Sequence, residues 1–222
     1  MSDTTQTAVT FGTGGDEPYA RALRTDGRLR LTDLGRPDAD VTMDVGRWNA
    51  AADRVDRSLL EDVDGPVIDI GCGPGRMLVA AMALGIPALG VDVSPEAVAI
   101  ATRSGGRAVQ GSVFDTVPDE GRWDTALVLD GNIGIGGDPV ALLARCRDIV
   151  RVGGRVVVET HTDRTADRTY LARVVDTDGH ASAEFPWAEV GLDAVRRHAA
   201  DVGLVARSSW TAAGRSFCEL VA

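Results

Sequence analysis

The sequence predicts an α/β fold in which a doubly wound, mostly parallel sheet carries helices on both faces. Short apolar runs typical of buried strands alternate with helix-like runs from residue 66 onward. The first of these strands passes directly into a glycine-rich loop and then a helix, within the stretch PVIDIGCGPGRM. Near the end of the chain, two strand-like runs are separated only by a turn at Gly214, which predicts an antiparallel final pair.

Composition limits the classes of function. The chain has 222 residues, of which 44% are hydrophobic, so it can bury a sizeable core, and no linker divides it. Its formal net charge is −10, and all 23 cationic residues are Arg. Binding along a phosphate backbone needs a basic stripe, which scattered Arg on an acidic chain does not provide. We therefore expect no nucleic-acid partner.

The cysteines and the apolar runs indicate a cytoplasmic protein. Cys72, Cys146 and Cys218 are odd in number and far apart, which favours buried thiols over a disulfide framework or a zinc motif. We expect no metal site. No apolar run approaches the roughly 20 residues that a membrane span needs, and the polar start MSDTTQTAVT is unlike a signal peptide.

Residues 1–65 are predicted to form an N-terminal extension with helices. Met1 to Pro18 is small, polar and Gly-rich, so it buries little apolar surface of its own. A helix is expected at Pro18 to Arg24, then a turn-rich stretch through Gly35 to Pro37. Apolar residues at helical spacing predict one amphipathic helix from Val45 to Leu60.

The glycine loop that follows indicates a nucleotide-type site. A buried strand at 67–70 leads into Gly71, Gly73 and Gly75 and then an apolar helix. Residues without a Cβ let the backbone turn sharply and let a ligand approach the N–H groups of the helix N-terminus. A dinucleotide fingerprint needs a glycine at the sixth position, where this chain has Arg76, and a Walker loop needs a Lys, which the chain lacks.

The remaining pattern resembles a known family. Asp69-x-Gly71-x-Gly73-x-Gly75, with Asp92 ending the next strand, is similar to the first motif of class I S-adenosylmethionine-dependent methyltransferases. The resemblance covers residues 66–222 and implies a Rossmann-like, seven-stranded sheet with an antiparallel C-terminal strand. It also implies S-adenosylmethionine as cofactor and N-terminal helices that cover it and contribute to the substrate pocket.

The other elements of the expected core follow in order. Strands are predicted at Ala88 to Val93, Arg107 to Ser112, Thr125 to Asp130, Arg155 to His161, Leu204 to Thr211 and Ser216 to Val221. Helices are predicted at Glu96 to Arg103, Pro139 to Val150 and Leu192 to Val202, the first of them after the start signal Ser94-Pro95.

The segment at about 165–190 is longer than an ordinary link between a strand and a helix. Apolar and polar residues alternate there around the turn signal Asp178-Gly179, which predicts an inserted β-hairpin. Two interpretations stay open: the hairpin forms the rim of the active site, or it is exposed and either pairs with a second subunit or decorates the surface.

The resemblance assigns cofactor contacts at the strand ends, where ligands of open α/β sheets bind. Asp69 would meet the methionyl ammonium, and Asp92 would accept both ribose hydroxyls; a role in starting the next helix is the alternative for Asp92. At the adenine, where the family usually has an acidic residue beside a small one, this chain has Ser112 and Val113. The expected cofactor-binding residues are Asp69, Gly71, Cys72, Gly73, Gly75, Asp92, Val93, Ser112, Val113, Asp130 and Asn132.

Methyl transfer is an in-line displacement, which needs alignment and, for a nucleophile that carries a proton, a base. His161 and Asp130, at the ends of two strands, are the candidate catalytic residues. The loop after Asp130 holds four glycines in seven residues, which indicates backbone close to the methyl donor. Residues expected to line the acceptor pocket are Arg47, Trp48, Asn132, His161 and Trp187.

The sequence therefore predicts a methyltransferase that acts on oxygen or nitrogen of a small molecule, as in bacterial secondary metabolism, and that is a monomer or a homodimer. The Asn-Pro-Pro-aromatic motif of enzymes that methylate DNA amino groups is absent. Two rivals remain: a protein that binds S-adenosylmethionine without turnover, and an NAD-dependent or nucleotide-sugar oxidoreductase.

Overall fold

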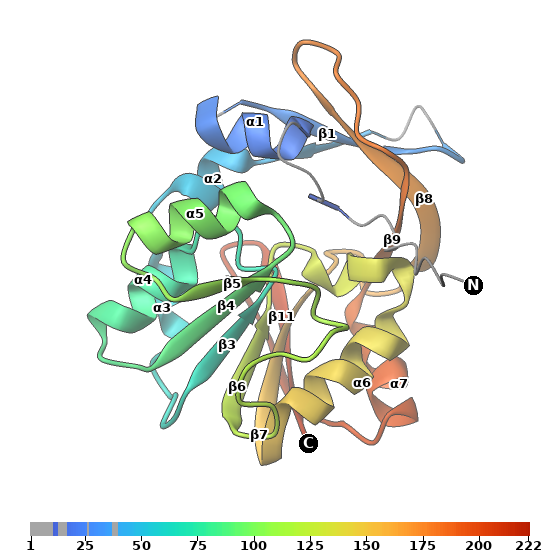
Figure 1. Ribbon diagram of the computed structural model, residues 1–222. Helices are drawn as coiled ribbons and strands as arrows, with labels where there is room; N and C mark the ends of the chain where they lie inside the picture. Colours follow the sequence, from blue (N-terminus) through green and yellow to red (C-terminus); the bar gives the residue numbers. More distant parts are fainter. Residues whose placement is uncertain (1–10, 13–16, 26, 37–39) are drawn as a thin grey trace, which may run out of the picture.

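The computed structural model describes residues 11–12, 17–25, 27–36 and 40–222, and its centre is a seven-stranded sheet (Figure 1). The strands are β3 (Val67–Ile70), β4 (Ala88–Asp92), β5 (Ala108–Gln110), β6 (Trp123–Val128), β7 (Val150–Thr160), β10 (Val205–Ala212) and β11 (Arg215–Val221). Their order is β10-β11-β7-β6-β3-β4-β5, and β11 runs antiparallel to both of its neighbours. The predicted sheet and its antiparallel C-terminal strand are confirmed.

Helices cover both faces of this sheet, as predicted. On one side lie α3 (Arg54–Ser58), α4 (Arg76–Ala83) and α5 (Pro95–Arg103), and on the other α6 (Pro139–Ile149) and α7 (Leu192–Asp201) (Figure 1). Neighbouring residues of β3 point to opposite faces: Ile68 and Ile70 join the apolar cluster of α6 and α7, whereas Val67 joins that of α4. The core therefore has two layers, one on each face.

Helix starts follow the local signals in the sequence. The Ser94 hydroxyl accepts a hydrogen bond from the N–H of Ala97, and Pro95 occupies the first turn. Asp138 caps α6 in the same way, again with a proline in the first turn. These caps explain why α5 and α6 begin at or next to the positions that the sequence predicts.

A second, four-stranded sheet lies above the first (Figure 1). It contains β1 (Leu29–Asp33), β2 (Val41–Met43), β8 (Asp167–Asp176) and β9 (Phe185–Val190), in the order β2-β1-β8-β9 with every pair antiparallel. The predicted hairpin is thus present as β8 and β9. It pairs with β1 of its own chain, a strand that the sequence analysis does not predict.

The predicted single helix from Val45 to Leu60 is wrong. The segment forms α2 (Val45–Asn49) and then α3, because Ala50 takes an extended conformation and ends the first helix. Asp53 then starts the second helix through a capping box with Asp56. Apolar spacing continues across the break, so the pattern alone does not reveal it.

The described residues before Pro66, here called the cover, include α1 (Pro18–Thr25), which confirms the helix expected there. Residues 1–10 and 13–16 lie outside the described residues, so the expectation for the tail is not addressed. Phe11 is described and packs against Tyr19 of α1 and against Phe185 and Trp187 of β9. The cover and the hairpin therefore form one continuous structure.

Two of the glycines after Asp130, Gly134 and Gly137, have a packing role that the sequence does not reveal. They lie in the short 3-10 segment η1 (Asn132–Gly137), which packs closely on β9. A Cβ on Gly134 would overlap the carbonyl oxygen of Ala188, and one on Gly137 would lie 2.7 Å from Cβ of Pro186. These two glycines allow the loop to contact the hairpin at backbone distance.

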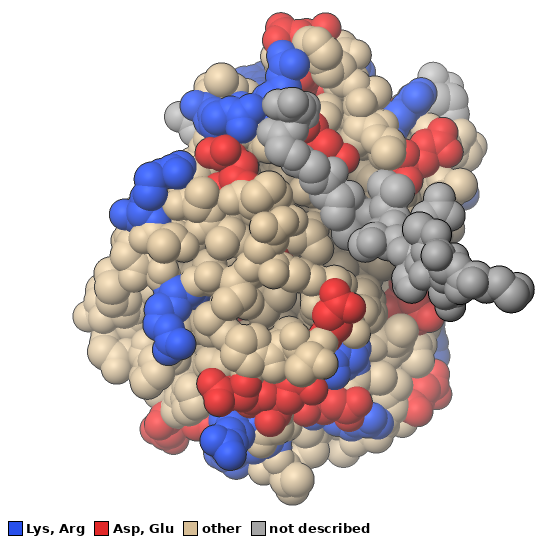
Figure 2. Space-filling model, viewed as in Figure 1, with Lys and Arg blue, Asp and Glu red and all other residues tan. Residues whose placement is uncertain are grey.

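Within the described part of the chain, no helix is long and apolar enough to cross a membrane. On the face shown in Figure 2, arginines are interspersed with acidic and uncharged residues.

Candidate functional site

A pocket opens where β3, β4 and β6 end, between the main sheet and the cover. It holds about 910 Å³ not filled by protein atoms, its open mouth included. From the core it is lined by Asp69, Gly71, Cys72, Gly73, Arg76, Asp92, Val93, Ser112, Val113, Asp130 and Asn132, among others. From the other side it is lined by Phe11, Tyr19, Met43, Trp48, Ile135 and Trp187.

The three glycines of the loop have positive φ angles, 69° at Gly71, 53° at Gly73 and 89° at Gly75. Side chains rarely adopt this conformation, so the loop needs glycine at each position. Their surroundings differ. A Cβ on Gly75 would lie 2.8 Å from Cβ of Ala101, and Gly75 does not line the pocket, so this glycine serves the packing of α4 on α5.

Asp92 is buried at the end of β4 and supports the glycine loop. Its Oδ2 accepts a hydrogen bond from the N–H of Gly73 at 2.8 Å, and its Oδ1 accepts one from the N–H of Ser94, also at 2.8 Å. Burial raises the pKa of the Asp92 carboxyl to about 6, although these two hydrogen bonds lower it. The carboxylate both lines the pocket and fixes the loop to the start of α5.

Asp69, in β3, is also buried and lines the pocket. Burial raises its pKa to about 7, against the influence of the nearby Arg76 guanidinium. Among the described residues we find no hydrogen-bond partner for its carboxylate. A cationic group of a ligand could therefore pair with this carboxylate, for which the described residues of the pocket offer no hydrogen-bond partner.

Asn132 connects the ends of two strands. Its side-chain N–H₂ donates to the carbonyl oxygens of Ile70 and Gly71, at 2.8 and 2.9 Å. A Cβ on Gly71 would lie 2.6 Å from Nδ2 of Asn132, so this glycine leaves room for the amide. Asn132 thus holds the glycine loop against the tip of β6 while facing the pocket.

The expected adenine-side residues Ser112 and Val113 line the pocket, together with Val93 and Cys72. The Ser112 hydroxyl accepts a hydrogen bond from the N–H of Phe114, which orders the turn after β5. Burial raises the pKa of the Cys72 thiol well above its usual value, so this thiol stays protonated at neutral pH.

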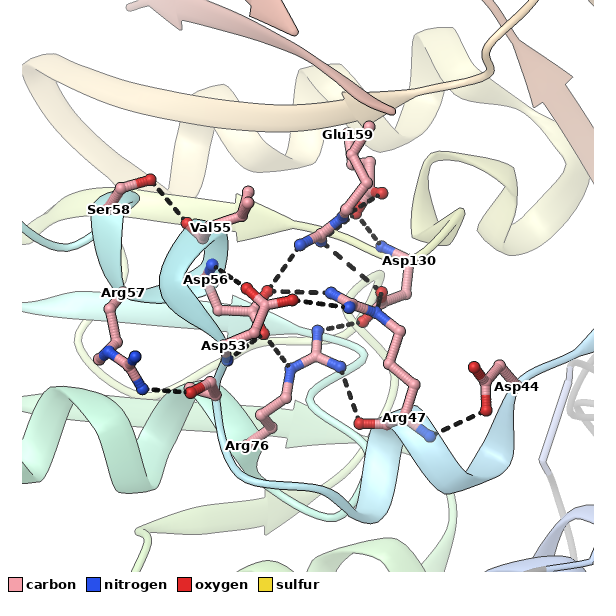
Figure 3. A network of polar contacts seen from close by, with 12 residues as sticks. Asp44, Arg47, Asp53, Val55, Asp56, Arg57, Ser58, Arg76, Asp130 and Glu159 are labelled. Atoms are coloured by element: carbon pink, nitrogen blue, oxygen red, sulfur yellow. Dashed lines mark hydrogen bonds and ion pairs between the residues drawn. The ribbon is translucent and has the colours of Figure 1, made fainter. Parts of the chain in front are cut away.

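A buried network of charges connects the cover to the core (Figure 3). At its centre is Asp56 of α3, whose side chain is 1% exposed. Three guanidinium groups reach its carboxylate: Arg47 of α2 at 3.1 Å, Arg76 of α4 at 2.9 Å and Arg215 of β11 at 2.7 Å. The Nε of Arg76 approaches as an ion pair rather than as an aligned hydrogen bond.

Asp130 belongs to the same network. Its carboxylate lies 2.6 Å from Arg76 and 3.4 Å from Arg47, and its N–H donates to Glu159 of β7. Its φ of 53° is unusual for a residue other than glycine, and these contacts hold it there. Asp130 lines the pocket as a paired carboxylate, and Arg47 acts from behind the pocket wall.

The structure does not bring His161 into this pocket. The side chain is exposed and lines a second, separate pocket with Glu159, Thr160 and Glu189, and Trp187 borders both pockets. Nδ1 of His161 accepts a hydrogen bond from the N–H of Asp163 at 3.0 Å.

Trp48 and Trp187 line the main pocket, as expected of acceptor-pocket residues. The sequence analysis does not identify Tyr19, which is buried, lines the pocket and has its hydroxyl 3.3 Å from the position of a Cβ on Gly73. In the sequence, Arg76 serves only as evidence against an NAD-binding loop. A buried arginine directly after the glycine loop is the signal that points to the charge network.

Comparisons with known proteins agree with this geometry. A family model described as a methyltransferase domain matches residues 20–199. No curated protein matches the sequence.

Three solved structures illustrate the likeness in fold. A SAM-dependent methyltransferase from Bacteroides fragilis in complex with S-adenosyl-L-homocysteine is 19% identical, with a TM-score of 0.77 over 95% of this chain and 97% of that one. The 1,6-didemethyltoxoflavin-N1-methyltransferase of Burkholderia thailandensis is 18% identical, with a TM-score of 0.57 over 76% of each chain. An amino pentose methyltransferase from Micromonospora echinaspora is 16% identical, with a TM-score of 0.53 over 75% of this chain and 86% of that one.

The family model covers most of the chain, and the sheet order, the glycine loop and the acids at the strand ends fit it. This chain therefore belongs to the methyltransferase-domain family and has the fold of the class I, S-adenosylmethionine-dependent methyltransferases.

Proposed function

We propose that this protein transfers the methyl group of S-adenosylmethionine to an oxygen or nitrogen atom of a small molecule. One observation carries the proposal. A loop whose glycines have positive φ angles and two buried carboxylates at strand ends lie in the same pocket. The family membership gives the type of reaction. Related structures contain S-adenosyl-L-homocysteine or act on small molecules, according to their names.

Each side chain in the cofactor half then has a role that its position supports. Asp69 would pair with the methionyl ammonium, because its carboxylate is buried and has no partner among the described residues. Asp92 would accept the ribose hydroxyls while it holds the N–H of Gly73. Ser112 and Val113, after β5, would contact the adenine.

The NAD alternative is disfavoured by Arg76. This residue stands where a dinucleotide fingerprint needs its last glycine, and its guanidinium fills the space beside Asp56 and Asp130. A protein that binds the cofactor without turnover differs from an enzyme only in whether S-adenosylhomocysteine accumulates.

We also propose a cellular location, a kind of acceptor and an oligomeric state. Three buried cysteines without disulfides fit the cytoplasm, where thiols stay reduced. A small-molecule acceptor fits an enclosed pocket better than a nucleic acid would, and a monomer or a homodimer is expected.

The test is titration calorimetry with S-adenosylhomocysteine on the wild type, on Asp92→Ala and on Asp115→Ala. Loss of the buried Asp92 carboxylate should weaken binding by roughly 1.5 to 3 kcal/mol, the range for hydrogen bonds to charged groups. Asp115 is an exposed acid after β5, the strand beside β4, and does not line the pocket, so its variant should bind like the wild type. Unchanged affinity of folded Asp92→Ala would place the ribose elsewhere, and a melting temperature raised by NAD instead would favour the oxidoreductase.

A further inference from the structure

One wall of the pocket consists of four aromatic side chains that follow one another across it. Trp48 of α2, Tyr19 of α1, Phe11 and Trp187 of β9 have successive ring centroids 5.8, 4.8 and 5.8 Å apart. All four line the pocket, and together they are called the aromatic arch. The arch is assembled from the cover and the second sheet, outside the elements that carry the glycine loop.

The opposite wall is different in character. It consists of the glycine loop with Asp69 and Asp92, the residues that the proposed function assigns to the cofactor. About 910 Å³ not filled by protein atoms lies between the two walls, the open mouth of the pocket included. The proposed cofactor site beside the glycine loop leaves the arch side, where Trp48 and Trp187 lie, to the acceptor.

The arch side offers little to a charged acceptor. Of the charged residues that line the described pocket, Arg76 and Asp130 pair with each other at 2.6 Å, and Asp69 and Asp92 lie at the cofactor wall. The polar side-chain atoms on the arch are the Tyr19 hydroxyl and the indole N–H groups of Trp48 and Trp187. The Tyr19 hydroxyl lies nearest the glycine loop, 3.3 Å from the position of a Cβ on Gly73. Burial raises the pKa of this phenol well above its usual value, so it stays protonated and can donate a hydrogen bond.

We propose that the methyl acceptor is a planar aromatic molecule that packs against the aromatic arch and turns one polar substituent toward the cofactor. The inference rests on the proposed function and names its substrate class. Contacts between aromatic rings favour flat aromatic ligands over saturated ones of the same size, beyond the effect of the area that is buried.

The reaction then balances as follows. A lone pair of the substituent forms the bond to the methyl carbon, and the bond from that carbon to sulfur breaks with its electron pair remaining on sulfur. The products are the methylated acceptor and S-adenosylhomocysteine. A proton from a hydroxyl or amine substituent passes to solvent, because Tyr19 is already protonated and Asp130 is held by arginines.

The experiment compares two probes of similar size and different shape, 1-naphthol and its saturated counterpart decahydro-1-naphthol. Each is equilibrated by dialysis with the full-length protein loaded with S-adenosylhomocysteine, and the bound fraction is measured. We expect about tenfold tighter binding of the flat probe. In Trp48→Leu this preference should disappear, in Trp48→Phe it should persist in part, and in the control Trp210→Leu it should be intact, because Trp210 stacks on Phe217 away from the pocket.

The outcomes separate this inference from the proposed function. Equal binding of the two probes by protein that binds S-adenosylhomocysteine would overturn the aromatic acceptor and leave the cofactor assignment standing. A preference that survives in folded Trp48→Leu would place the flat probe outside the arch and overturn the inference as well. Failure to bind S-adenosylhomocysteine at all would contradict the proposed function itself.

Discussion

At the scale of single residues, the site depends on carboxylates that the fold buries before a ligand arrives. Asp69 and Asp92 are 4% and 8% exposed, and burial raises the pKa of each, to about 7 and about 6. A buried charge without a partner is unfavourable, and a cationic or hydroxyl-bearing ligand relieves that cost. Removing the charge of either residue should therefore weaken ligand binding and raise the stability of the ligand-free protein.

Asp69→Asn tests this opposition. The folded pKa of Asp69 lies above its unfolded value, so the folded protein holds a proton between about pH 4 and 7 that the unfolded chain releases. The contribution of Asp69 to the free energy of unfolding thus falls as pH rises through that window. In calorimetry, we expect the melting temperature of the ligand-free variant to exceed that of the wild type at pH 8 and to equal it near pH 4. The affinity of the variant for S-adenosylhomocysteine should be lower than that of the wild type. Asp64→Asn, at an exposed position, is the control, and equal melting of Asp69→Asn and wild type at pH 8 would contradict the account.

A sequence pattern identifies a residue of the pocket or of its loop where the backbone and the chemistry both require one residue type. The three glycines and the two strand-end acids are recognisable because each position demands one residue type. Tyr19 and Asp56 escape sequence analysis because their roles come from tertiary contacts across the cover, which no local pattern encodes. His161 directly follows the end of β7 at Thr160, but the pocket it lines is separated from the main one by Trp187.

At the scale of elements, the cover is fixed to the core by ion pairs rather than by apolar packing alone. Asp56 contacts guanidinium groups from α2, α4 and β11, so one carboxylate connects three segments far apart in sequence (Figure 3). Removing one partner of a buried charge network leaves the others uncompensated. The position of Arg76 beside the pocket depends on this network.

Asp56→Asn should therefore destabilise the protein by about 3 to 5 kcal/mol, the range for breaking a buried ion pair. Urea denaturation measures the change, and Glu61→Gln, at an exposed acid just after α3, is the matched control. A loss below about 1 kcal/mol, as for a surface pair, would show that the network contributes little to holding the cover.

Gly134→Ala tests the contact between η1 and β9. A methyl group at this position meets the carbonyl oxygen of Ala188 and the ring of Trp187, so we expect about 1 to 3 kcal/mol of destabilisation from overpacking. Gly111→Ala is the control, because a Cβ there meets nothing within 4 Å. Equal urea midpoints for the two variants would mean that the loop can move away from the hairpin at no cost.

Local sequence signals predict the helices and strands of the core well, and they predict those of the cover poorly. Caps such as Ser94 and Asp138 mark helix starts, and buried runs mark the parallel strands. The strand β1 is only five residues long, and it is stabilised by pairing with β8, more than 130 residues later in the chain. The break between α2 and α3 is set by the Asp53 capping box, which an unbroken apolar periodicity conceals.

At the scale of the whole molecule, the expected division into residues 1–65 and a core with an inserted hairpin stays a prediction, and the structure shows that the two regions pack together. Strands from both regions form the second sheet, and side chains from both form the aromatic arch. The main sheet supplies the wall with the glycine loop, and α1, α2 and β9 supply the facing wall. The pocket exists because two structures assembled from distant segments meet at one edge of the main sheet.

The proposed function places S-adenosylmethionine in this pocket with its ribose at Asp92 and its reactive end facing the aromatic arch. A crystal structure of the complex with S-adenosylhomocysteine tests it most directly. We predict ribose hydroxyls within hydrogen-bond distance of the Asp92 carboxylate, the methionyl ammonium at Asp69, and the sulfur open toward Trp48 and Trp187. A ligand bound elsewhere, or in this pocket with its sulfur turned away from the arch, would contradict the account.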